Sequence, residues 1–183
     1  MGTTIKVSLS ADSLLKAAEA VRTYKDSLKD KCREFREQLI DIGISTGESN
    51  CGKYAGMIVF KRDDEGADKS LLVATDGEKV IREWRYRGDT KSVEVSPLLM
   101  AEFGSGWLSE NLLEVAGVGQ GTFPGQKHAF DEGGWRWTTL DNVTHHSVGE
   151  IPTHPMYAAM MQMQSDIDRI ARQVFGTDEV IQC

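Results

Sequence analysis

Residues 11–42 of this 183-residue chain read ADSLLKAAEAVRTYKDSLKDKCREFREQLIDI. Apolar side chains recur in this stretch every three or four residues, which places them on one face of a helix: Leu14, Ala18, Val21, Tyr24, Leu28, Cys32, Phe35, Leu39 and Ile42. Ser10 is suited to cap the first turn, and Gly43 predicts the end of the helix. A helix of this length spans about 48 Å, so we expect it to lie across a sheet or to project against a neighbouring subunit.

Strand patterns surround this helix. Residues 5–9 alternate before it, and a loop rich in glycine, serine and asparagine is predicted after it, at 44–53. An antiparallel meander is then predicted from strands at 54–61, 71–75, 80–87 and 92–96. Residues 98–103 fit either a short helix or a strand. A later strand pair is predicted at 135–139 and 143–148, with the turn at 140–142.

A second amphipathic helix is predicted near the C-terminus. Thr153 is suited to cap it, Pro155 lies near its start and Gly176 closes it. Its apolar stripe, which we expect to pack in the core, comprises Met156, Met160, Met163, Ile167, Ile170 and Val174. Residues 177–183 are predicted to form a tail. The chain is therefore expected to be a single α+β domain over 1–183, interrupted by an extended loop or arm at 107–134.

The bulk composition narrows the function classes. A net charge of -7 and a pI near 5.1 disfavour a sequence-independent nucleic-acid binder, which needs a basic surface. No apolar run approaches the roughly 20 residues that span a bilayer, and the first ten residues lack the pattern of a signal peptide. We therefore expect synthesis and residence in a cytosol. The three cysteines, Cys32, Cys51 and Cys183, form no metal-binding or disulfide pattern.

Motifs for catalysis are weak. A metal hydrolase would need several of His128, His145, His146 and His154 to converge with a carboxylate such as Asp131 or Asp141. His145 and His146 are neighbours in a predicted strand, so their side chains are expected on opposite faces. Gly104-Ser105-Gly106 lacks the spacing of a nucleophile elbow. We expect no catalytic residue, no cofactor and no metal.

Two features favour contact with other chains. Met161 lies off the stripe of the last helix, which makes it a candidate for an outer contact. The long loop carries Phe123, Pro124 and Phe130, and loops of this length commonly bind something or pack on their own domain. Both a docking arm and a self-packed loop fit these residues.

Two motifs and their order resemble a known family. Glu102-Phe103-Gly104-Ser105-Gly106 is followed about fifty residues later by Pro152-Thr153-His154-Pro155-Met156 and the terminal helix. This arrangement is similar to the gene-product-ten-like neck proteins of tailed bacteriophages and spans most of the chain. The stretch 119–126 and Gly134-Trp135 also resemble a variant of that family. Ser105 stands where threonine is common, and 107–134 is longer than in the simplest members.

The resemblance implies a virion structural protein of the neck. It implies a ring of this chain, usually of six copies, that contacts the head connector and the tail tube while genomic DNA passes through its lumen. It would assemble in the host cytoplasm, without a membrane. The turn-motif and interface candidates are Glu102, Phe103, Gly104, Ser105, Gly106, Phe123, Pro124, Phe130, Pro155, Met156 and Met161. Phe103 would anchor the turn in the core, and Glu102 would cap a nearby amide or pair with a basic residue across the ring.

Three alternatives remain open at the level of sequence. A tail terminator or tail-completion ring at the tail top has the same features as a neck adaptor. A small metal-assisted hydrolase would use His128, His145 and His154. A regulatory binding module would hold a peptide with its long loop.

Overall fold

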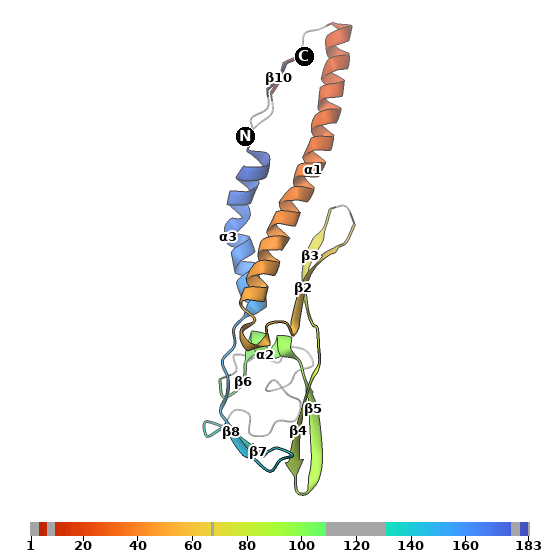
Figure 1. Ribbon diagram of the computed structural model, residues 1–183. Helices are drawn as coiled ribbons and strands as arrows, with labels where there is room; N and C mark the ends of the chain where they lie inside the picture. Colours follow the sequence, from red (N-terminus) through yellow and green to blue (C-terminus); the bar gives the residue numbers. More distant parts are fainter. Residues whose placement is uncertain (1–3, 7–9, 67, 109–130, 177–179, 183) are drawn as a thin grey trace.

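The computed structural model describes residues 4–6, 10–66, 68–108, 131–176 and 180–182. Figure 1 shows an elongated molecule, with the long helices in one half and most of the strands in the other. The α+β fold class predicted from the sequence is confirmed. Among the described helices, none is both long and apolar enough to cross a membrane.

The long helix α1 extends from Ala11 to Ser49. Ser10 caps it as predicted, since its hydroxyl accepts a hydrogen bond from the Ser13 N–H at 3.2 Å. The predicted end at Gly43 is wrong, and so is the loop predicted from residue 44. Gly43 and Gly47 are instead buried positions of close packing. A Cβ at Gly43 would lie 2.5 Å from the Met163 sulfur, and one at Gly47 would overlap the ring of Phe60.

The second long helix, α3 (Pro155–Phe175), packs antiparallel against the C-terminal half of α1. Ile170 is fully buried, and the ring of Phe175 lies 5.7 Å from that of Phe35. Gly176 caps the end of α3, as predicted. Because α3 ends opposite Phe35, the N-terminal part of α1 projects beyond it (Figure 1). The long helix thus both packs within the domain and extends away from it.

The strands form separate sheets. β2 (Ile58–Asp64) and β3 (Ser70–Asp76) make a hairpin alongside α1 (Figure 1). A four-stranded sheet has the order β5-β4-β7-β8. Its strands are β4 (Val80–Tyr86), β5 (Asp89–Val95), β7 (Trp135–Thr138) and β8 (Thr144–Ser147). The single meander predicted over 54–96 is therefore wrong, because β3 does not pair with β4. β2 and β3 form a two-stranded sheet of their own, whereas the β4–β5 hairpin is joined to β7 and β8.

The core lies where α1 ends. The 3-10 turn η1 (Gly52–Tyr54), the helix α2 (Pro97–Phe103) and the starts of both hairpins meet there. The ambiguous segment 98–103 is thus helical, and Ser96 caps it by accepting from the Leu99 N–H. The buried apolar side chains of this core are Cys51, Tyr54, Ile58, Phe60, Val95, Met100 and Ala101.

Two short strand pairs complete the described fold. β6 (Ser105–Gly106) pairs antiparallel with β9 (Gly149–Glu150). β1 (Thr4–Lys6) pairs parallel with β10 (Val180–Gln182). The predicted tail at 177–183 is therefore wrong for 180–182, which form a strand. The predicted strand at 5–9 is confirmed for 5–6, and 7–9 lie outside the described residues.

Candidate functional site

The two sequence motifs meet at the start of α3. The carboxylate of Glu102 accepts hydrogen bonds from the backbone N–H of Met156 at 2.8 Å and of Tyr157 at 3.1 Å. The first N–H groups of a helix have no partner within it, and a negative charge there also suits the helix dipole. Glu102 is therefore the cap of α3, which confirms the first of its two expected roles.

The backbone reinforces this junction. The carbonyl of Ala101, in the last turn of α2, accepts from the N–H groups of Thr153 at 2.8 Å and His154 at 3.1 Å. The predicted cap at Thr153 is wrong: the capping position is His154, with a left-handed φ of 53°, and its side chain makes no capping hydrogen bond. Pro155 follows, and because proline lacks an N–H it leaves Met156 as the first donor for Glu102.

The glycines of the turn allow the backbones to touch. Gly104 has a φ of 68°, and a Cβ there would overlap the Glu150 carbonyl and approach Pro152. Ser105, only 2% exposed, pairs with Glu150 in the β6–β9 ladder. Gly106 has a φ of 63° and pairs with Gly149. Phe103 is half-buried and is not one of the side chains of the core cluster, so its predicted role as a core anchor is not confirmed.

The junction contains a second polar contact, which the sequence analysis did not predict. The Tyr54 hydroxyl donates to the Glu150 carboxylate at 2.6 Å, and the Lys53 ammonium lies 2.6 Å from the other oxygen of that carboxylate. Burial, followed by the hydrogen bond to Glu150, raises the pKa of Tyr54. Tyr54 and Glu150 are 96 residues apart in sequence, and no local pattern indicates that they meet.

An apolar groove opens beside the capped helix end. It is lined by Leu72 of β3, Glu102 of α2 and four residues of α3: Met156, Tyr157, Met160 and Met163. Tyr157 and Met160 are each 55% exposed, and Met161, just outside the lining, is 44% exposed. Met161 is thus accessible, as its predicted outer contact requires. The prediction that the whole stripe is core is wrong for Met160 and for Ile167, which is 43% exposed.

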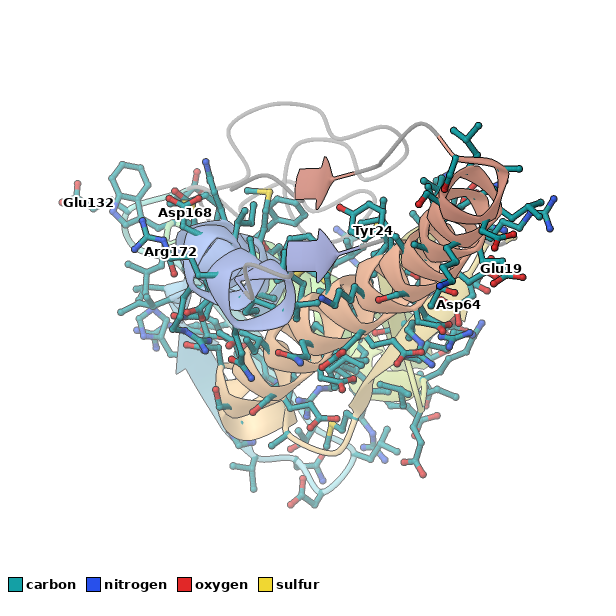
Figure 2. The ribbon with its side chains drawn as sticks, turned by 90° about the horizontal axis from the view of Figure 1, so that it is seen from above. Glu19, Tyr24, Asp64, Glu132, Asp168 and Arg172 are labelled. Atoms are coloured by element: carbon teal, nitrogen blue, oxygen red, sulfur yellow. The ribbon has the colours of Figure 1, made fainter. Side chains whose placement is uncertain are left out.

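The α3 stripe differs from the prediction because of where α1 lies. The buried face of α3 includes Ile170 and Val174 of the predicted stripe together with Ala159, which was not predicted. Met163 of the stripe lies against Gly43 of α1, whereas Met160 and Ile167 are exposed. Figure 2 shows Asp168 and Arg172 on the opposite side of α3, away from α1. When methionines lie on two adjacent faces of a helix, the sequence pattern does not specify which of the two faces packs against the neighbouring helix.

The histidines do not converge. His145 stacks on Trp137 with ring centroids 5.2 Å apart, while the ring of His146 lies within hydrogen-bond distance of the Gly133 carbonyl at 2.7 Å. His154 lies at the start of α3, and its ring meets that of Tyr157 edge-on. His145 and His146 are consecutive in β8, as predicted. Over the part of the chain that the structure describes, no three histidine, cysteine or acidic side chains are grouped to hold a metal.

The remaining candidates lie elsewhere. Phe123, Pro124 and Phe130 fall outside the described residues, and with them His128 and most of the predicted 107–134 arm. Trp107, at the start of that predicted arm, is 54% exposed.

Comparison of the chain with protein-family models, curated proteins and solved structures returns no match.

Proposed function

We propose that this protein is a structural component of the bacteriophage neck, where several copies form a ring between head connector and tail tube. One observation carries the proposal. The motif around Glu102 and the motif around Pro155, whose order resembles the neck family, form one junction through the capping bonds to Met156 and Tyr157. The two motifs, although about fifty residues apart in sequence, are thus parts of one structural junction.

The charge of the chain fits such a place. A ring through which DNA passes must not bind it, and acidic walls repel phosphate. The net charge of -7 supplies that repulsion if some of the carboxylates line the lumen. Replacing lumen acids by lysines is then expected to slow DNA ejection, and unchanged ejection would refute this part of the proposal.

The elongated shape supports the proposal independently of the motifs. The helical arm and the four-stranded sheet lie at opposite ends of the molecule (Figure 1). A subunit of this shape offers separate surfaces to its neighbours in a ring and to the components on either side. The capped junction between α2 and α3 joins the two ends.

Copy number in purified particles tests the proposal. Quantitative mass spectrometry of particles, with the major capsid protein as internal standard, is expected to find the chain at a small fixed number per particle, near the usual six of the family. Particles free of the chain would contradict a virion role. A tail terminator would also give a fixed number, and it is distinguished because it would remain with tails separated from heads.

A further inference from the structure

Helices α2 and α3 begin in the same way. Each has a proline at its first position, Pro97 or Pro155, so the residue after the proline is the first to offer an N–H. In each helix a carboxylate from a distant part of the chain accepts that N–H. Glu102 has this role for α3, and for α2 the carboxylate of Asp76, at the end of β3, accepts from the Leu98 N–H at 2.8 Å. Both helix starts are therefore fixed by tertiary contacts.

Helix α2 consequently takes part in a capping contact at each of its ends. At its start, Asp76 of β3 and the hydroxyl of Ser96, which accepts from the Leu99 N–H at 3.1 Å, hold the first turn. In its last turn, Glu102 caps α3, and the Ala101 carbonyl accepts from the two residues that precede α3. Figure 1 shows α2 between the helix pair and the strand half of the molecule. The element thus connects the end of β3 with the start of α3.

The helix is too short to keep its conformation by itself. It has seven residues, or roughly two turns over about 10 Å, whereas isolated helices shorter than about 12–15 residues are marginal in water. Its stability therefore comes from the contacts at its two ends and from the burial of Pro97, Met100 and Ala101. With only two turns, loss of the hydrogen bonds at one end leaves little helix to hold the other. We therefore expect α2 to loosen as a unit.

The elements that the two caps connect also line the groove. Leu72 belongs to β3, Glu102 to α2, and Met156 and Tyr157 to the first turn of α3. The walls of the groove are thus carried by three elements whose relative positions depend on two carboxylates. A change at either cap is expected to change the groove as well.

We propose that α2 couples its two caps, so that the hold of Asp76 on α2 and the hold of Glu102 on α3 strengthen or weaken together. A movement of the β2–β3 hairpin is then transmitted through α2 to the start of α3 and to the groove. Coupling between two sites is reciprocal, so each cap affects the other by the same factor. The inference concerns a single copy of the chain and does not depend on the proposed neck function.

Amide hydrogen exchange of the full chain, followed by NMR, tests the coupling. Asp76→Ala is expected to speed exchange of the Met156 and Tyr157 N–H groups by at least about fivefold, the low end of usual coupling between sites. The amide of Ile170, which is fully buried in α3, reports the stability of the whole fold and is expected to change less. Glu78→Ala removes an exposed carboxylate from the turn after β3 and is the matched control, with rates expected to equal those of the wild type.

Further substitutions check the direction and the cause of the effect. Glu102→Ala is expected to speed exchange of the Leu98 N–H by a similar factor, because the coupling is reciprocal. Asp76→Asn keeps one acceptor oxygen and is expected to restore wild-type exchange at the start of α3. If Asp76→Ala does not fold, Ser96→Ala removes the other acceptor from the same end of α2 and is expected to give the same acceleration at the start of α3.

Thermal unfolding supplies an independent measure. Substitutions at well-separated sites usually have additive effects on stability, and the two caps lie at opposite ends of α2. If the caps are coupled, the double variant Asp76→Ala, Glu102→Ala loses less in Tm than the sum of the two single losses, because either substitution already loosens α2.

Three results would overturn the proposal. Faster exchange confined to α2, with the first turn of α3 unchanged, would show that the caps are independent. Acceleration at Met156 and Tyr157 that only equals the acceleration at Ile170 would show that Asp76 acts through the stability of the whole fold. An additive loss of Tm in the double variant would contradict the coupling as well.

Discussion

The carboxylate of Glu102 holds the start of a helix that lies 54 residues further along the chain. Each of its oxygens accepts one backbone N–H of the first turn of α3. The side chain therefore has the role that a local serine or aspartate has in most helices. Because the contact is long-range, it stabilises the helix end and the α2–α3 junction together.

Replacing Glu102 by alanine is expected to lower the free energy of unfolding by about 1–2 kcal/mol, since two N–H groups lose their acceptor. For a chain of this size each kcal/mol corresponds to roughly 2–4 °C in Tm. Glu102→Gln keeps one acceptor oxygen, so its free energy of unfolding is expected to lie between those of Glu102→Ala and the wild type. Thermal unfolding measures both, with exposed Glu132→Gln as control. Equal Tm values for Glu102→Ala and wild type would contradict the capping role.

Tyr54 gives a prediction for alkaline pH. Burial and the bond to Glu150 raise the pKa of its hydroxyl above the ordinary 10.0. The folded state therefore keeps this proton when the unfolded state has lost it, and the stabilisation disappears as pH rises above 10. Tyr54→Phe is expected to cost about 1.5 kcal/mol at pH 8, with a smaller difference from wild type at pH 11. Denaturant unfolding at both pH values measures this. A difference that grows with pH would refute it.

At the scale of elements, the close contact between α1 and β2 depends on Gly47. Alanine favours helices over glycine by about 1 kcal/mol, yet a methyl group at Gly47 would overlap the ring of Phe60. We expect Gly47→Ala to destabilise the fold by roughly 1–3 kcal/mol, as overpacked cores do. Thr23→Ala, on an exposed turn of the same helix, is the control and is expected to be neutral or slightly stabilising. Increased stability of Gly47→Ala would contradict the observed packing.

How far the sequence predicts the elements depends on whether their signals are local. The cap at Ser10, the strands flanking Asn142 and the end of α3 at Gly176 follow from neighbouring residues, and all three are confirmed. Gly43 carries the local signal of a helix end, but α1 continues through it because the glycine allows close packing against Met163. The pairing of Tyr54 with Glu150 has no local signal at all. Of the candidate site, the sequence gives the motif residues and one role of Glu102, but not the groove.

At the scale of the whole molecule, the helical arm and the sheet end would make different contacts in the proposed ring. The projecting half of α1 and the sheet end would offer separate surfaces to neighbouring copies and to the head connector or the tail tube. The net charge of -7 would keep DNA moving past the ring. If the chain has these roles, we expect it to join the particle late in assembly, after heads and tails have been built separately.

Electron microscopy of particles from a strain that lacks this gene tests the neck assignment most directly. The account predicts filled heads and finished tails lying unjoined, with joined particles restored when the wild-type chain is supplied from a plasmid. Tails of uncontrolled length would indicate a terminator at the tail top instead. Normal, infectious particles in the absence of the chain would contradict the central claim.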